Sequence, residues 1–170
     1  MKTALIIDVA NMYFQTQRAY GNYRINYDRY LNNLRKQGLN LTHMFAFGHQ
    51  RQADVPAFSH LMKSLGFTLR FGNVSWNVEI ALQMARIVNN IECFVLGSSE
   101  PELGRLFVFA KEHGVICRCN AVQIPTFFKN TGVICQEVDE TLLDAVNYEP
   151  KDSTQQLELR SNFNGNVVKS

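Results

Sequence analysis

The sequence lacks the long apolar runs that mark membrane proteins and secreted precursors. No stretch approaches the roughly 20 consecutive apolar residues that a membrane-spanning helix needs. The first apolar run, residues 4–7, is interrupted by Asp8 and is too short for the core of a signal peptide. We therefore expect a cytoplasmic protein without a membrane partner.

Several motifs of common enzyme classes are also missing. No G-x-G-x-x-G follows the first apolar run, which argues against a dinucleotide cofactor, and no G-x-x-x-x-G-K-[ST] offers a P-loop. The G-x-S-x-G turn of serine hydrolases is absent. Position 10 is Ala10, whereas phosphoaspartyl hydrolases carry a second aspartate two residues after the first.

Cysteines are few and are not spaced as metal or redox motifs. There are four, none in a C-x-x-C pair, and all lie within apolar stretches. Cys117 and Cys119 would face the same side of one strand, an arrangement that does not favour a bridge between them. A reduced interior is expected rather than a disulfide or zinc framework.

The composition that remains is that of one globular domain with an uneven charge distribution. The chain has 170 residues, 46% of them hydrophobic, enough for one substantial core. The net charge of +2 divides into +6 over residues 1–70 and −4 over residues 71–170. A basic half beside an acidic half can bind a polyanion next to a metal site, with ordinary solvated surface charge as the alternative.

Short apolar runs alternate with helical patterns along the chain. This alternation predicts βαβ units and an α/β fold with a mostly parallel sheet of five or six strands. We predict one domain over residues 1–146 and a poorly ordered tail over residues 147–170. Strands are predicted at residues 4–7, 42–47, 67–71, 93–96, 115–119 and 133–135, and helices at residues 26–36, 55–64, 78–88 and 101–113.

Two segments fit this alternation less well. Residues 15–26 are interpreted as a mobile loop, and residues 120–130 as a loop or a short helix. Within the helix at residues 26–36, Tyr27 and Tyr30 fall on the apolar face and are expected to point inward.

Four acidic residues are predicted to meet at the carboxyl edge of the sheet, where ligands bind in open parallel sheets. Asp8 ends a fully apolar strand, a costly position for a carboxylate unless it is paired, hydrogen-bonded or bound to metal. Glu79 begins a helix, and Glu100 and Glu102 follow the strand at residues 93–96. As alternatives, Glu79 favours the helix dipole, and residues 99–102 form a capping box in which Ser99 caps and Glu102 folds back.

These residues resemble the NYN domains, a bacterial branch of the PIN-like nuclease superfamily. Residues 6–13 are similar to the family's first motif, in which a strand ends in Asp-x-x-Asn. Residues 78–82 resemble its Val-Asp-Val before an apolar helix, and residues 98–103 resemble its Ser-Gly-Asp-x-Asp-Phe. The likeness extends over about residues 3–120, and three of the four acidic positions carry Glu where the family pattern has Asp.

The resemblance implies a three-layer, Rossmann-like (PIN-like) sandwich and a metal-dependent ribonuclease. The acids would hold Mg²⁺ or Mn²⁺, and metal-activated water would attack the RNA phosphodiester in line. Asn11 and Ser98 would be neighbouring polar ligands or substrate contacts. By the same resemblance, the catalytic and metal-binding residues would be Asp8, Glu79, Glu100 and Glu102.

Arginine and tyrosine side chains in the basic half offer phosphate contacts and stacking surfaces for single-stranded nucleic acid. RNA is the expected partner, single-stranded DNA stays open, and assembly into a homo-oligomer is compatible with the sequence. A catalytically inactive relative that binds nucleic acid or a protein partner is the main alternative, and a nucleotide-binding module without hydrolysis is a third. The predicted substrate-binding residues are Asn11, Ser98, Ser99, Arg18, Tyr20, Tyr23, Arg24 and Arg51.

Overall fold

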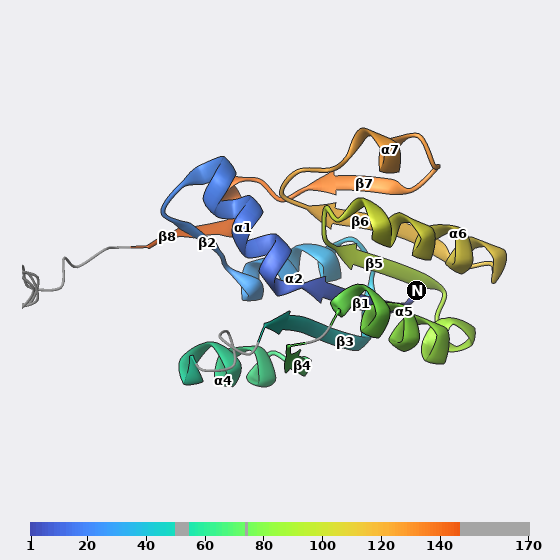
Figure 1. The fold of residues 1–170 in the computed structure, drawn as a ribbon, viewed down its shortest axis with the longest axis horizontal. Coiled ribbons are helices and arrows are strands. Elements are labelled where there is room, and N and C mark those ends of the chain that lie inside the picture. The colour runs from blue at the N-terminus through green and yellow to red at the C-terminus, as the bar shows by residue number, and fades with distance from the viewer. Residues whose placement is uncertain (50–54, 74, 147–170) are drawn as a thin grey trace, which may run out of the picture.

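A central sheet of six parallel strands organises the protein (Figure 1). The structure, a computed structural model, describes residues 1–49, 55–73 and 75–146. The predicted α/β fold with a sheet of five or six strands is confirmed. In spatial order the strands are β4 (Thr68–Gly72), β3 (Asn40–His49), β1 (Lys2–Asp8), β5 (Cys93–Gly97), β6 (Ile116–Ala121) and β7 (Ile134–Glu137).

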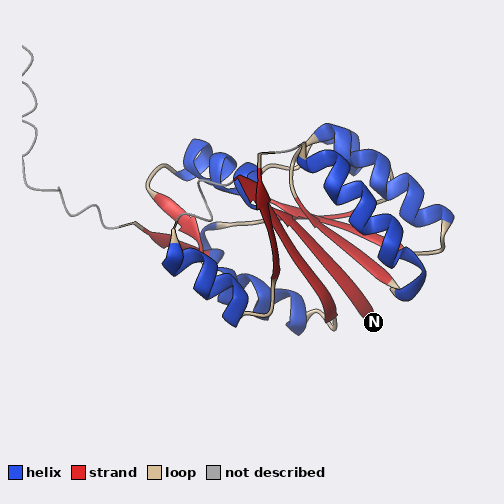
Figure 2. Ribbon diagram, turned by 60° about the horizontal axis from the view of Figure 1, so that its bottom comes forward, coloured by secondary structure: helices blue, strands red, loops and turns tan. Residues whose placement is uncertain are grey.

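Helices cover both faces of this sheet (Figure 2). Aromatic contacts connect helices on each face: Tyr27 meets Phe58 with ring centroids 6.2 Å apart, and Phe107 meets Phe128 at 5.2 Å. The helices are α1 (Val9–Tyr20), α2 (Tyr27–Lys36), α4 (Pro56–Ser64), α5 (Trp76–Ile87), α6 (Gly104–Glu112) and α7 (Thr126–Lys129), with short 3₁₀ turns η1 (Val88–Asn90), η2 (Pro101–Leu103) and η3 (Glu140–Leu142).

β1 occupies the middle of the sheet, as its apolar run predicts. Residues 4–7 are fully buried, since β3 pairs with β1 on one side and β5 on the other. The chain continues from β1 toward β3 and β4, and later crosses back to β5, β6 and β7. This reversal makes the carboxyl end of β1 the switch point at which open α/β sheets form a crevice.

The loop predicted over residues 15–26 is wrong. α1 continues to Tyr20 and ends at Gly21, whose φ of 69° suits glycine. Few apolar residues mark this helix, because its buried face uses small or flexible side chains such as Ala10, Met12 and Thr16. The chain then enters the short strand β2 (Tyr23–Ile25).

β2 pairs with a strand from the far end of the domain and forms a second, two-stranded sheet. Its antiparallel partner is β8 (Leu143–Ala145). Arg29 on α2 reinforces the pairing: its guanidinium donates to the carbonyl oxygens of Thr141 at 2.9 Å and Leu143 at 3.2 Å, and forms an ion pair with Asp144. The end of the domain is thereby fastened beside α1 and α2.

Four further expectations from the sequence can be compared with the structure. All four cysteines carry free thiols, and Tyr27 and Tyr30 are buried on the inner face of α2 as predicted. None of the helices in the described part of the chain has the length and apolar character needed to span a bilayer. The predicted tail over residues 147–170 lies outside the described residues.

Candidate active site

Asp8 joins β1 to α1 at the switch point of the sheet. It is the last residue of β1 and the N-cap of α1, and its carboxylate accepts a hydrogen bond of 3.0 Å from the backbone N–H of Asn11. A carboxylate in this position is stabilised by the helix N-terminus. The side chain is nevertheless 8% exposed, so it has lost most of its contact with water.

Burial raises the pKa of the Asp8 carboxyl above its usual value of 3.8, and the negative charge of Glu100 raises it further. Hydrogen bonds from the backbone of Asn11 and Ala10, together with the charge of His49, lower it without cancelling the effect of burial. The local structure therefore leaves the ionised form of Asp8 incompletely compensated. Such a carboxylate, beside a second one, is a suitable ligand for a cation.

Asn11 connects the ends of β1 and β5. Its Oδ1 accepts hydrogen bonds of 2.9 Å from both the backbone N–H and the hydroxyl of Ser99. The hydroxyl of Ser98 accepts from the backbone N–H of Glu100 at 3.1 Å. These bonds hold the segment that carries Glu100 against the segment that carries Asp8, so Asn11, Ser98 and Ser99 position the two acids.

The capping box expected at residues 99–102 does not form. Glu100, rather than Ser99, is the N-cap residue of η2, because Ser99 is engaged by Asn11. Glu102 is exposed and accepts a hydrogen bond of 2.8 Å from Nδ2 of Asn77 in the first turn of α5. Glu79, half-buried, stands in that same turn. Glu102 thus lies at the contact between η2 and α5, and Glu79 lies in the first turn of α5.

Few protein ligands are available to a cation at these four acids. Within the described residues, none of them takes part in an ion pair, and no group of three or more Asp, Glu, His or Cys side chains is arranged to hold a metal. Mg²⁺ commonly binds through one or two carboxylates and keeps several waters. The buried carboxylate of Asp8 and the half-buried Glu100 fit that mode, with Glu79 and Glu102 left as predicted ligands.

The predicted substrate-binding residues outside this edge are spread along α1 and β2. Arg18 is exposed in the last turn of α1, and Tyr23 is exposed on β2. The hydroxyl of Tyr20 donates to the carbonyl of Val138 at 3.4 Å, and its ring packs against the core. Arg24 lines a cleft, described next, whereas Arg51 lies outside the described residues.

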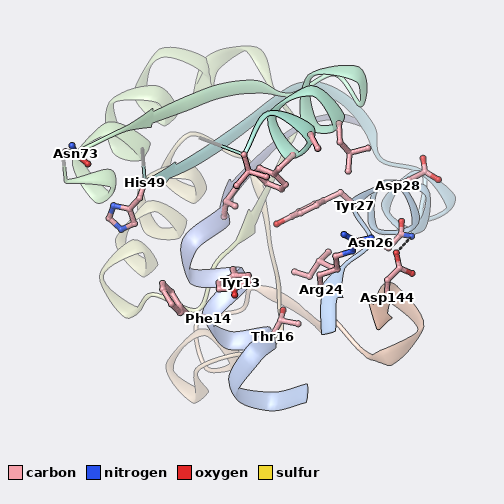
Figure 3. A pocket seen from close by; sticks show the side chains of 16 residues that line it. Tyr13, Phe14, Thr16, Arg24, Asn26, Tyr27, Asp28, His49, Asn73 and Asp144 are labelled. Carbon is pink, nitrogen blue, oxygen red and sulfur yellow. Dashed lines mark hydrogen bonds between the residues drawn. The ribbon is translucent and has the colours of Figure 1, made fainter. Parts of the chain in front are cut away.

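A cleft of about 1010 Å³ opens next to Asp8, between α1, β2, α2 and α4; we call it the α1–α4 cleft (Figure 3). His49 and Asn73 lie at one end, and Asn26 donates to Asp144 at 2.9 Å at the other. Most of the remaining wall is apolar or aromatic. The lining residues are Val9, Tyr13, Phe14, Thr16, Arg24, Ile25, Asn26, Tyr27, Asp28, His49, Val55, Ala57, Phe58, Leu61, Asn73 and Asp144.

Sequence reasoning missed His49 and the aromatic wall of this cleft. His49 ends β3, two residues beyond Phe47, the register partner of Asp8, and its charge acts on Asp8. The predicted strand ends at residue 47, so His49 falls outside it. Tyr13 is one of the tyrosines of the basic half for which stacking is expected, but Phe14 was missed because no helix is predicted there. Their positions could have indicated a place near the site, because both lie in the first turns of the helix that Asp8 caps.

Asp8→Asn is expected to stabilise the metal-free protein at pH 7, because it removes a buried charge while asparagine keeps the N-cap. The folded state binds the Asp8 proton more tightly than the unfolded chain, so wild-type stability falls as pH rises from 3.8 through the raised pKa. The advantage of the variant should therefore grow with pH over that window. Urea unfolding in EDTA across this range measures it, and a variant less stable than wild type at pH 7 contradicts the prediction.

Comparisons with known proteins agree with this architecture. The structure is similar to the crystal structure of a protein of unknown function from Vibrio parahaemolyticus, with a TM-score of 0.73 and 16% sequence identity. The match covers 84% of this chain and 96% of that chain, and at this identity it shows a shared fold. No curated protein matches the sequence. Residues 2–141 match the NYN domain family.

Proposed function

Because the chain belongs to the NYN domain family, whose members are generally nucleases, we propose that it hydrolyses RNA phosphodiester bonds with the aid of Mg²⁺ or Mn²⁺. The observation that carries this proposal is the buried Asp8 carboxylate at the switch point, next to Glu100. A buried carboxylate whose charge is incompletely compensated, beside a second carboxylate, favours a hard divalent cation over a neutral ligand.

The residues of the proposed site would have different roles. Asp8 and Glu100 would hold the ion, with Glu79 and Glu102 as the outer acids. When bound, Mg²⁺ or Mn²⁺ polarises a phosphate and makes a bound water a better nucleophile at neutral pH. Asn11 fixes the spacing of the two inner acids through Ser99, and this chemistry requires no covalent nucleophile from the protein.

Electrostatics support a polyanionic substrate at the same edge. Arg24 lies on the wall of the α1–α4 cleft and, within the described residues, enters no ion pair, so its charge remains available to a phosphate. The excess of basic over acidic residues before position 71 also favours binding of a polyanion.

A second candidate is a catalytically inactive NYN protein that binds nucleic acid. It is favoured by the hydrogen bond that engages Glu102 with Asn77 and by the lack of a three-acid group within the described residues. In this case the acids would act as caps and as surface charge, and metal would add nothing to RNA binding.

Incubation of the purified protein with end-labelled single-stranded RNA separates the two candidates. We expect cleavage with Mg²⁺ or Mn²⁺ and none in EDTA, resolved by denaturing electrophoresis, with DNA of the same sequence included to identify the sugar requirement. Absence of cleavage in both metals, from protein shown to be folded, contradicts the nuclease proposal. RNA binding without cleavage then leaves the second candidate.

A further inference from the structure

The α1–α4 cleft opens directly beside the proposed site of phosphate chemistry. Val9, the residue after Asp8, lines it, and so do Tyr27 and His49, which both interact electrostatically with Asp8. A nucleotide whose phosphate would be held through a cation at Asp8 and Glu100 can therefore place an adjacent base in the cleft. The volume of about 1010 Å³ is at the upper end of small-molecule sites and exceeds what one base requires.

The walls of the cleft present aromatic surface to solvent. Tyr13 and Phe14, in the first turns of α1, are 49% and 64% exposed, with their ring centroids 5.5 Å apart in an edge-to-face arrangement. Large aromatic side chains exposed side by side indicate a binding surface more than a packing requirement. Phe58 of α4 also lines the cleft. Aromatic faces of this kind stack on nucleobases of any sequence.

Tyr27 supplies a polar group inside this apolar wall. Its ring is 7% exposed and packs on Tyr30, Phe58 and Phe67, with centroids 6.2 to 6.4 Å away. Its hydroxyl is directed into the cleft (Figure 3). A hydroxyl that faces the cleft can donate or accept a hydrogen bond with a ligand bound there.

The far end of the cleft has fixed polar groups. Asp144 is held by Asn26 at 2.9 Å and by the ion pair with Arg29, so much of its charge is compensated within the protein. Arg24 stands beside this pair as an available cation. The cleft thus combines aromatic surface, the Tyr27 hydroxyl and the Arg24 cation, next to the acidic edge at Asp8, and this combination is complementary to a nucleotide.

We propose that the α1–α4 cleft receives one unstacked base of single-stranded RNA, which stacks on Tyr13 and Phe14 and accepts or donates a hydrogen bond at the Tyr27 hydroxyl. The proposal rests on the nuclease function, because the same strand supplies the phosphate at Asp8. It assigns the substrate class as unpaired RNA, since a base in a duplex cannot leave its stack without losing its pairing.

The test measures RNA affinity by fluorescence anisotropy in the Asp8→Asn background, in which cleavage is expected to be about 100- to 1000-fold slower. The probe is a labelled single strand of about ten nucleotides, within the usual site size of single-strand binders. Phe14→Ala should weaken binding about 5- to 100-fold, the effect of losing one base–aromatic stack. Phe127→Ala is the matched control, since Phe127 on α7 is similarly exposed, 56%, and lies away from the cleft.

Tyr27→Phe tests the hydroxyl separately from the fold. It keeps the buried ring and removes only the hydroxyl that faces the cleft, so its melting temperature should stay close to that of the parent. RNA affinity should still fall, by about 5-fold, as expected for one hydrogen bond. A purely structural role for Tyr27 would give the reverse pattern, a lower melting temperature with unchanged affinity.

Two further probes identify the occupant. An otherwise identical RNA lacking one base at each position in turn should lose affinity at one position, and the Phe14→Ala variant should be insensitive to that loss. A mononucleotide should bind more weakly than the RNA; equal affinity would make the cleft a site for free nucleotides and overturn the proposal.

The remaining outcomes distinguish this proposal from the function on which it rests. If wild-type protein cleaves RNA but Phe14→Ala and Tyr27→Phe bind like the parent, the base pocket is wrong and the nuclease stands. Equal losses in Phe14→Ala and Phe127→Ala also overturn the pocket. If wild-type protein neither cleaves nor binds RNA, the proposed function fails, and the pocket proposal fails with it.

Discussion

Asp8→Asn is expected to lower the rate of RNA cleavage by about 100- to 1000-fold, the size of effect seen when one preorganised electrostatic group is lost from an active site. Asparagine preserves the volume and the N-cap hydrogen bond to Asn11, so the fold is retained. The loss is confined to the negative charge that would hold the ion. The measurement is the single-turnover rate on labelled RNA at saturating Mn²⁺.

Metal binding can be measured in the same variant from the melting temperature, with no need for an activity assay. A ligand at 100 times its Kd stabilises a protein by about 2.7 kcal/mol, so Mn²⁺ should raise the melting temperature of the wild type and leave that of Asp8→Asn unchanged. Glu112→Gln is the control, because Glu112 is an exposed acid at the last residue of α6. Equal Mn²⁺ stabilisation of wild type and Asp8→Asn would place the ion elsewhere.

Asn11→Ala is expected to cost about 1 to 3 kcal/mol of stability and to reduce cleavage about 10- to 100-fold. The change removes the single acceptor of both the N–H and the hydroxyl of Ser99, a residue that is 8% exposed. Two donors are then left unpaired, and the strand ends that carry Asp8 and Glu100 are free to separate. Urea unfolding and single-turnover kinetics measure the two effects.

Ser99→Ala provides the matched comparison for Asn11→Ala. It removes the hydroxyl but keeps the backbone N–H bond to Asn11, so its stability loss should be smaller, about 1 kcal/mol. A positioning role also predicts that Asn11→Ala needs more Mn²⁺ for half-maximal rate, which a general loss of stability would not cause. An unchanged Mn²⁺ requirement would reduce Asn11 to a structural residue.

The sheet could be predicted from the sequence because its strands are buried on both faces. Residues 4–7 and Cys93–Gly97 form short apolar runs between turns, and each became a strand with little change of boundary. The same reasoning located Asp8 at a ligand-binding edge. The position of Asp8 could be predicted because the apolar strand and the carboxylate that follows it lie within a few residues of each other in the sequence.

Other parts of the fold depend on contacts that a local pattern does not contain. α1 buries Val9, Ala10, Met12 and Thr16, too few large apolar residues to give a clear helical period. β2 and β8 are three residues each and acquire their structure only by pairing across the length of the domain. The α1–α4 cleft was missed for the same reason, since its walls come from these elements.

The candidate site was predictable in part. The acids were found because each stands next to a strong strand or helix signal, but spacing alone could not show that Asn77 engages Glu102 or that Ser99 turns to Asn11. Those partners are 25 and 88 residues distant in sequence. Side-chain partners at such separations follow from the folded geometry.

Because β2 pairs with β8, the end of the α1–α4 cleft can form only after residues 143–145 have been synthesised. Asp8, Glu79, Glu100 and Glu102 have all left the ribosome before Leu143–Ala145, the strand that closes the end of the α1–α4 cleft. A nascent chain thus has its acidic edge before it has a finished chamber for a base. The complete cleft therefore depends on β8 and forms only when nearly all of the described domain is present.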